Sequence, residues 1–244
     1  QAEFLNYNNT GMSIIEMSHR SKEYAAMHAE TKALLRELMQ IPDDYEILFI
    51  QGGGSLQFLM TAANFFTKQR AAYTNTGVWA KKAMAEAKRY GEVYEACTSA
   101  DKNHSYIPDK LELKPDTSYL HITANNTIYG TEWQNFPDIN VPIICDMSSD
   151  ILSRPVDVKK FSLIYAGAQK NLGPAGVVIV IVKKAFLETA RQDLPPMLSY
   201  QNYAANDSLY NTPPVFAIYM VNKTLHWIKA QGGVNALAER NRAK

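Results

Sequence analysis

A single lysine, Lys170, stands in the stretch YAGAQKNLGPAG (165–176), between two short apolar runs typical of buried strands. We expect a lysine this close to an apolar interior to be shielded from water, which would make its amine a usable nucleophile. The glycines and proline that follow it indicate an unusual backbone path. A surface lysine on a solvated turn is the alternative, although a plain turn does not need that path.

An acidic residue and a glycine-rich turn also follow apolar runs. Asp146 comes directly after VPIIC (141–145), where a buried carboxylate is costly unless a positive group neutralises it. The stretch GGGSLQF (52–58) follows EILFIQ (46–51). Its glycines would let backbone N–H groups approach an anion, and a helix beginning at Ser55 would offer first-turn donors to a phosphate. The alternatives are a capping or turn aspartate and a tight strand-to-helix turn without a ligand.

The elements around these residues predict that they lie close together. Helical periodicity and short apolar runs alternate along the chain, which favours an α/β fold with a mostly parallel sheet covered on both faces. The predicted helices are 18–41, 55–66, 78–91 and 213–233, and the predicted strands are 45–51, 71–77, 92–98, 118–123, 141–149, 161–168 and 176–182. Ligands of such sheets bind beyond the carboxyl ends of the strands, where all three features fall.

A phosphate-binding turn, an acid and a shielded lysine are the parts that a pyridoxal phosphate site needs. Lys170 would hold the cofactor aldehyde as a Schiff base, and the glycine turn would bind the 5′-phosphate. Asp146 would keep the pyridine nitrogen protonated, so that the ring can withdraw electrons from a carbanion. The residues alone therefore predict a possible pyridoxal phosphate enzyme.

Several longer stretches resemble the phosphoserine aminotransferases, in the family's order along nearly the whole chain. They are SHRSKE, GGGSLQF, NTGVWAKKA, NNTIYGTE, DMSSDILSRPVDV, YAGAQKNLGPAG and YNTPPVF. The resemblance implies a fold-type I transferase whose large domain has a mostly parallel seven-stranded sheet with helices on both faces. It implies reversible amino transfer from L-glutamate to 3-phosphohydroxypyruvate in serine biosynthesis. Some bacterial members also use a 4-phosphohydroxythreonine analogue.

The resemblance also assigns site residues. It implies Lys170 and Asp146 as the catalytic pair, Trp79 as the aromatic that stacks on the cofactor, and Thr127 as a hydrogen-bonding partner of the cofactor. The remaining implied residues are Gly54, Ser55 and Gln169 at the phosphate, Asn211 and Thr212 at the phosphate of the neighbouring subunit's cofactor, and His19 and Arg20 at substrate anions. A core tryptophan is the alternative for Trp79, and a solvated helix start for His19 and Arg20. Shared active sites would make the protein a homodimer.

The family resemblance also implies a domain division. Residues 1–230 would form the cofactor-binding large domain, and 231–244 the start of a small C-terminal domain that is largely absent. We expect the sequence to be a piece of a longer protein, because the family carries further residues at both ends. The alternative function is a catalytically silent fragment that only folds and dimerises.

Composition argues against several other functions. The chain has 25 basic and 24 acidic residues, which gives no support for nucleic-acid or membrane-surface binding, and no apolar run reaches transmembrane length. Cys97 and Cys145 lie in apolar settings and are predicted to be free thiols, which fits the cytoplasm. Neither stands on a mobile loop, as a desulfurase would require. A nicotinamide dehydrogenase would need a G-x-G-x-x-G fingerprint, which does not follow any predicted strand.

Overall fold

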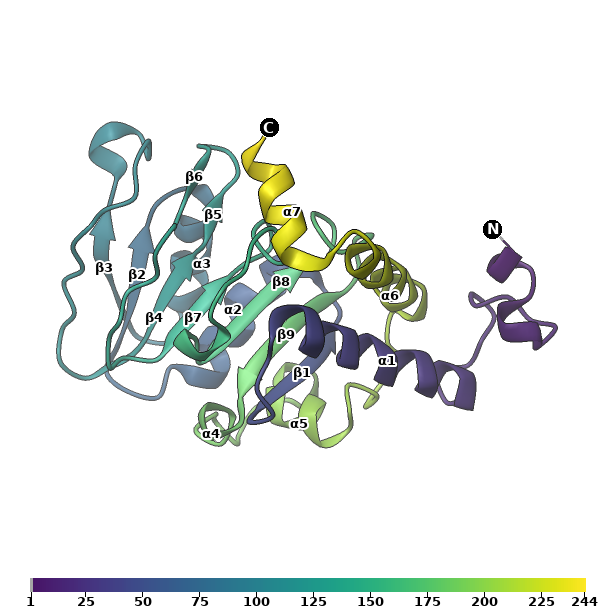
Figure 1. The fold of residues 1–244 in the computed structure, drawn as a ribbon. Coiled ribbons are helices and arrows are strands. Elements are labelled where there is room, and N and C mark those ends of the chain that lie inside the picture. The colour runs from purple at the N-terminus through teal and green to yellow at the C-terminus, as the bar shows by residue number, and fades with distance from the viewer. Residues whose placement is uncertain (1) are drawn as a thin grey trace.

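The computed structural model describes residues 2–244, and its centre is a seven-stranded sheet in the order β1-β9-β8-β7-β4-β2-β3 (Figure 1). The strands are β1 Tyr45–Ile50, β2 Arg70–Asn75, β3 Glu92–Thr98, β4 Thr117–Thr123, β7 Ile143–Asp146, β8 Leu163–Gly167 and β9 Val178–Lys183. Strand β9 runs antiparallel to both of its neighbours, and the other pairs in the sheet are parallel. The predicted mostly parallel sheet is confirmed.

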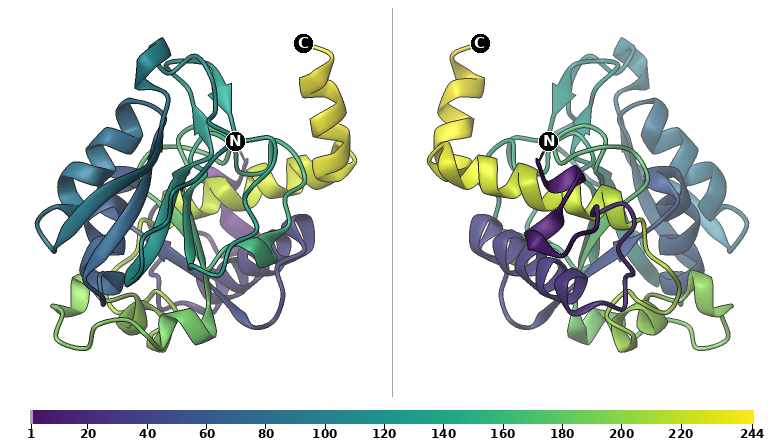
Figure 2. Two further views of the ribbon diagram at one scale, coloured as in Figure 1. Left: turned by 90° about the vertical axis from the view of Figure 1, so that its left-hand side faces the viewer. Right: turned by 90° about the vertical axis from the view of Figure 1, so that its right-hand side faces the viewer.

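Helices cover both faces of the sheet, as Figure 2 shows. On one side lie α2 (Gly53–Phe65) and α3 (Val78–Ala87), and on the other lie α1 (Lys22–Met39) and α6 (Val215–Ala230). Alternate strand residues point into the two layers: Ile47 and Phe49 pack in the α1/α6 core, whereas Leu48 packs in the α2/α3 core. Both faces are therefore buried, which accounts for strands that read as continuous apolar runs.

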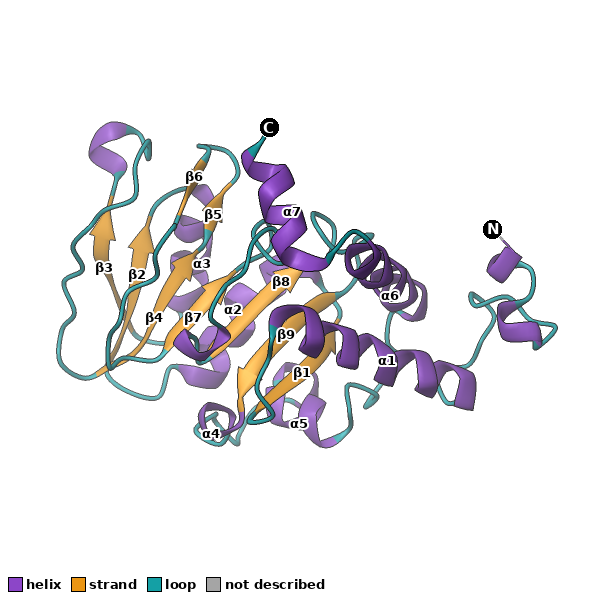
Figure 3. Cartoon of the chain, viewed as in Figure 1, coloured by secondary structure: helices purple, strands orange, loops and turns teal. Residues whose placement is uncertain are grey.

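Shorter elements complete the chain (Figure 3). They are the helices α4 (Lys184–Leu187), α5 (Tyr200–Ala205) and α7 (Gly233–Arg242), the strands β5 (Asn125–Asn126) and β6 (Thr131–Glu132), and the 3-10 turns Ala2–Phe4, Tyr7–Asn9, Ala100–Lys102, Val158–Lys160 and Pro196–Leu198. The predicted long helix 213–233 ends at Ala230, and α7 begins after Gly232, whose φ is +94°. That left-handed backbone suits glycine and separates the two helices.

No helix within residues 2–244 combines the length and the apolar character that a bilayer span requires. Cys97 and Cys145 are both free thiols; Cys145 is buried and Cys97 is half-buried.

Two basic residues of α1 contact Asp207 in the segment after α5, and these contacts make the free energy of unfolding depend on pH in the acid range. His28 and Lys32 contact the Asp207 carboxylate and lower the pKa of Asp207 to about 2. The unfolded value is about 3.9, so this contribution is present above pH ~4 and is lost as the pH falls toward ~2. We expect Asp207→Asn to lower the urea midpoint near pH ~6 and to have a smaller effect near pH ~3. Asparagine tolerates the local φ of +49°, so backbone strain should not add to the change. An equal loss at both pH values would contradict this origin.

Candidate active site

The three features singled out in the sequence meet in one pocket at the carboxyl ends of β7 and β8. The residues that line it are Gly54, Ser55, Phe58, Trp79, Thr123, Asn125, Asp146, Ser148, Ser149, Gln169 and Lys170. Six of them were predicted: Gly54, Ser55, Trp79, Asp146, Gln169 and Lys170. The topology explains the meeting, because parallel strands present their carboxyl ends along the same edge of the sheet.

Lys170 lies on the turn after β8 and reaches across the pocket. Its Nζ donates a hydrogen bond of 3.1 Å to Thr127 Oγ1 and lies 5.7 Å from the centroid of the Trp79 ring. The prediction that Lys170 is shielded from water was wrong, since its side chain is exposed. The residues that precede it, from Leu163 to Ala168, are buried, but the turn lifts the long lysine side chain to the rim of the pocket.

Asp146 is the last residue of β7, and its side chain is buried. Ser148 donates to Asp146 Oδ1 twice, from its backbone N–H at 2.9 Å and from its hydroxyl at 2.6 Å. Burial raises the pKa of the Asp146 carboxyl, and the two Ser148 donors and the charge of Lys170 oppose that rise. Asp146 therefore does stabilise the turn that follows β7, as the alternative interpretation held, but it also lines the pocket.

The glycine turn forms another part of the pocket lining. Gly52 and Gly53 have φ values of +99° and +69°, which other residues rarely adopt. Helix α2 begins at Gly53, earlier than predicted, and no side chain within the described residues caps it, so its first-turn N–H groups are available to an anion. A Cβ added at Gly54 would lie 3.3 Å from Ser148 Oγ, so this turn packs closely on the loop after Asp146.

The pocket fits pyridoxal phosphate. Trp79 Nε1 and Thr123 Oγ1 are buried polar atoms that have no hydrogen-bond partner among residues 2–244, as expected where a ligand supplies one. Around them stand a helix start for a phosphate, a carboxylate for a protonated ring nitrogen, and an amine that can reach an aldehyde. These three groups match the phosphate, the ring nitrogen and the aldehyde of the cofactor.

Five predicted residues lie outside the pocket lining. Thr127 stands in the β5–β6 hairpin and joins the site through Lys170. Asn211 donates to Gln51 Oε1 at 3.0 Å, directly before the glycine turn, and Thr212 follows it. His19 and Arg20 precede α1; Arg20 is exposed and His19 is half-buried. The structure therefore brings Thr127 to the site but does not bring His19, Arg20, Asn211 or Thr212 into it.

Sequence reasoning missed five lining residues: Phe58, Thr123, Asn125, Ser148 and Ser149. Three of them carried a usable signal. Thr123 is the last residue of the predicted strand 118–123, and the two serines stand two and three residues after Asp146. Polar residues at the carboxyl ends of strands next to a predicted site residue are themselves site candidates.

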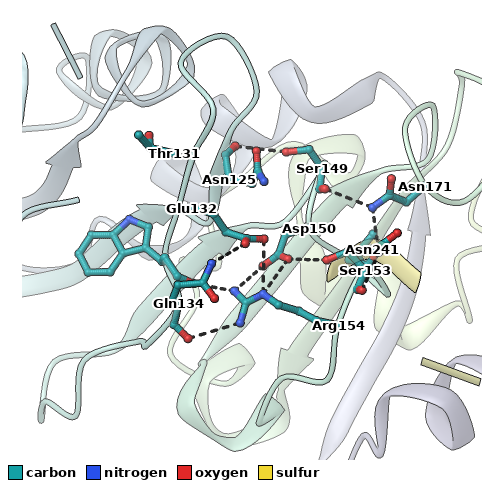
Figure 4. A network of polar contacts seen from close by, with 12 residues as sticks. Asn125, Thr131, Glu132, Gln134, Ser149, Asp150, Ser153, Arg154, Asn171 and Asn241 are labelled. Carbon is teal, nitrogen blue, oxygen red and sulfur yellow. Dashed lines mark hydrogen bonds and ion pairs between the residues drawn. The ribbon is translucent and has the colours of Figure 1, made fainter. Parts of the chain in front are cut away.

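A polar network holds the loops of the site together (Figure 4). Arg154 bonds Asp150 at 3.1 Å and Glu132 at 3.4 Å, so it joins the turn after β7 to the hairpin that carries Thr127. Asn171, next to Lys170, donates to the carbonyls of Ser149 and Ile151. Burial raises the pKa of Asp150 to about 6, and the Arg154 guanidinium opposes this rise.

Removal of Arg154 should destabilise the fold. The side chain of Asp150 is fully buried, and in Arg154→Met its carboxyl would lose the neighbouring guanidinium. We expect the free energy of unfolding to fall by roughly 3 kcal/mol. Arg191→Met is a matched control, because its pair with Asp193 is exposed and such pairs contribute about 0–1 kcal/mol. Urea unfolding at neutral pH measures both, and equal losses would show that Arg154 has no special role.

Comparison with known proteins identifies the family. The profile of the family Aminotransferase class-V matches residues 1–244. A phosphoserine aminotransferase of Bacillus subtilis (strain 168) is 54% identical over 247 residues, a match that covers 100% of this chain and 68% of that protein. The chain belongs to the phosphoserine aminotransferases. The resemblance stated from the sequence is confirmed.

Solved phosphoserine aminotransferases have the same fold. The enzyme from Bacillus circulans subsp. alkalophilus superposes with a TM-score of 0.97 at 50% identity, covering 99% of this chain and 68% of that chain. The phosphoserine aminotransferase from Trichomonas vaginalis, solved with PLP bound, has a TM-score of 0.93 at 40% identity, covering 98% of this chain and 69% of that one. These matches confirm the predicted fold class. Class-V aminotransferases use pyridoxal phosphate, which confirms the predicted cofactor.

Proposed function

We propose that the chain carries the cofactor-binding part of an enzyme that transfers an amino group between L-glutamate and 3-phosphohydroxypyruvate. The products are 2-oxoglutarate and O-phospho-L-serine, in the biosynthesis of serine. The observation that carries the proposal is the meeting of Lys170, Asp146 and the glycine turn in one pocket, in a chain 54% identical to a phosphoserine aminotransferase.

The residues of the pocket divide the chemistry among them. When bound, pyridoxal phosphate supplies an aldehyde for the amino group and a ring that withdraws electrons. Lys170 would hold the aldehyde of the cofactor, and its amine would serve as the general base for the proton of the substrate α-carbon. Thr127 orients the Lys170 amine, because it accepts the hydrogen bond from Nζ at 3.1 Å. Asp146 would stabilise the positive charge of the cofactor's ring nitrogen.

Other residues bind without moving protons. The first-turn N–H groups of α2, with Gly54, Ser55 and Gln169, bind the phosphate of the cofactor. Trp79 would stack on the cofactor ring, and its indole N–H, which has no hydrogen-bond partner among residues 2–244, would be available to the cofactor. Because Ser55 is neutral, the backbone donors carry most of this anion binding.

The complete enzyme is proposed to be a cytoplasmic homodimer with shared sites. Asn211 and Thr212 lie outside the pocket lining of their own chain, and we assign them to the phosphate of the partner's cofactor. His19 and Arg20 would contact substrate anions, for which the planar fork of an exposed arginine is suited. The free thiols of Cys97 and Cys145 support a reducing compartment.

The proposed domain boundary lies near residue 230. Residues 1–230 would form the cofactor domain, and 231–244 would begin the small domain. The helix break at Gly232 and Gly233 supports this division, because the two left-handed glycines separate α6 from α7.

An assay of substrate choice tests the proposal. Purified chain with pyridoxal phosphate and L-glutamate should form 2-oxoglutarate with 3-phosphohydroxypyruvate as acceptor, and far less with unphosphorylated hydroxypyruvate. Cofactor binding without turnover would instead favour the alternative of a fragment that folds and dimerises; the chain spans 68% of its Bacillus subtilis relative. Failure to bind the cofactor at all would refute the proposed site.

A further inference from the structure

One side chain ties the turn that carries Lys170 to the loop that follows Asp146. Asn171 is half-buried, and its amide nitrogen donates to the Ser149 carbonyl at 3.2 Å and to the Ile151 carbonyl at 3.0 Å (Figure 4). No backbone N–H in the described part of the chain donates to either carbonyl. The Asn171 amide therefore satisfies two acceptors that the backbone leaves open.

The residue type suits this place. An amide nitrogen carries two N–H groups, so Asn171 gives one to each carbonyl. Because both neighbours are acceptors, the amide must turn its nitrogen toward them and not its oxygen. An aspartate would have no proton to donate there when ionised, and a serine would have one. The position therefore calls for a short side chain with two donors.

The contacts close a circuit around Lys170. Ser149, whose carbonyl accepts from Asn171, donates its hydroxyl to the Asn125 carbonyl at 3.2 Å. Asn125 begins the β5–β6 hairpin, in which Thr127 accepts the hydrogen bond from Lys170 Nζ. The hydrogen bonds thus run from the tip of the lysine through the hairpin to the loop after β7, and back to the residue next to Lys170 in the chain.

The backbone of the turn does not supply this connection. The N–H groups of Leu172 and Gly173 both donate to the Ala168 carbonyl, so these bonds close the turn on itself. The Lys170 side chain is exposed, and a long exposed side chain samples many rotamers unless its base and its tip are held. Asn171 holds the base against the loop after β7, while the hairpin holds the tip.

We propose that Asn171 is a positioning residue that fixes the Lys170 amine at the place where it reaches the aldehyde of the cofactor. The inference rests on the proposed function for the role of Lys170. In the covalent step the neutral amine nitrogen bonds to the aldehyde carbon, and the aldehyde oxygen leaves as water with the two amine protons. This step requires the nitrogen at one defined point. Asn171 is not among the residues that line the active-site pocket, so it acts through Lys170.

The first test needs no cofactor. Asn171→Ala removes both amide hydrogen bonds, so the turn should open more often. We expect the backbone N–H groups of Leu172 and Gly173 to exchange with deuterium about tenfold faster than in the parent, as read by NMR. Equal exchange in the two proteins would show that the turn does not depend on Asn171 and would overturn the inference.

The second test separates covalent attachment from reversible binding. Quenching of tryptophan fluorescence measures the initial complex with pyridoxal phosphate, and borohydride reduction at timed intervals, followed by mass spectrometry, measures attachment. In Asn171→Ala we expect attachment to be about tenfold slower. The dissociation constant of the initial complex should stay within about threefold, because the residues that line the pocket are unchanged.

Two further variants control this result. The amide nitrogen of Asn64 also donates to two carbonyls, those of Met60 and Leu198, near the end of α2 that lies away from the glycine turn. Asn64→Ala should therefore lower stability but retain the parent rate of attachment. Asn171→Ser keeps one donor and should give an intermediate rate, so the inference stays open to refutation if Asn171→Ala does not fold.

The outcomes separate the two proposals. Parallel losses of binding and attachment in Asn171→Ala, or an equally slow attachment in Asn64→Ala, would give Asn171 a purely structural role and overturn the inference. If the unsubstituted chain attaches no pyridoxal phosphate, the proposed function fails. The exchange measurement still decides in that case whether Asn171 holds the turn.

Discussion

Lys170→Ala should lower the rate of amino transfer by about 10⁴-fold or more and should abolish covalent attachment of the cofactor. The reason is geometric: Lys170 supplies the amine in the pocket lining, and its Nζ stands between Thr127 and the face of Trp79. Steady-state formation of 2-oxoglutarate measures the rate. The loss of the visible absorbance of the bound cofactor measures the attachment.

Two comparisons make the Lys170 result specific. Lys68→Ala removes another exposed lysine, which lies just before β2 and thus at the opposite, amino end of the sheet, and it should retain the parent rate. Added methylamine should restore part of the rate to Lys170→Ala, because a small amine can enter the space that the side chain leaves. A Lys170→Ala protein with the parent rate would remove the basis of the mechanism.

Asp146→Asn should lower catalytic efficiency by about 100-fold or more, because an amide cannot hold the positive charge of the ring nitrogen as a carboxylate does. The change keeps the size of the side chain and an oxygen to accept the Ser148 hydrogen bonds. Initial rates with L-glutamate and spectroscopic titration with pyridoxal phosphate measure the two effects. Asp109→Asn, which alters an exposed carboxylate, should leave both values unchanged.

The same variant should be at least as stable as the parent when no cofactor is bound. Burial raises the pKa of Asp146 above its unfolded value, so the folded protein holds that proton more tightly. The stability this provides is present below pH ~4 and is lost as the pH rises through the folded pKa. A neutral asparagine avoids the cost of burying a charged carboxylate. The urea midpoint near pH ~7 should therefore be as high for Asp146→Asn as for the parent, or higher. A strong destabilisation would indicate that the carboxylate serves the fold rather than the site.

The sheet could be predicted from the sequence because its strands are short apolar runs separated by helical periodicity. The direction of β9 could not, since a fully buried strand such as Val178–Lys183 is apolar throughout whether its neighbours run parallel or antiparallel to it. The end of α6 was predicted only approximately, although the predicted domain boundary at residue 230 coincides with it. Gly232 and Gly233 were placed at the end of the predicted helix 213–233, but the helical pattern resumes directly after them.

The site could be predicted where residue type and position agree. Asp146 stands at the end of a buried strand and Gly54 in the turn after one. A carboxylate or a glycine-rich turn at such a position indicates ligand binding. The exposure of Lys170 could not be predicted, because apolar residues that precede a lysine do not determine where the tip of its long side chain lies. Thr123 and Ser148 were missed because small hydroxyl residues are common in ordinary turns and strand ends. The hydrogen bonds that Ser148 donates to Asp146 became visible only in the structure.

Reduction of the cofactor complex with borohydride, followed by peptide mapping, identifies the amine that holds pyridoxal phosphate. We propose that the Lys170 amine forms this covalent link beside Asp146 and the glycine turn. We expect reduction to fix the cofactor on the peptide that contains Lys170, and Lys170→Ala to carry no label there. A label on another lysine, or no label at saturating pyridoxal phosphate, would contradict it.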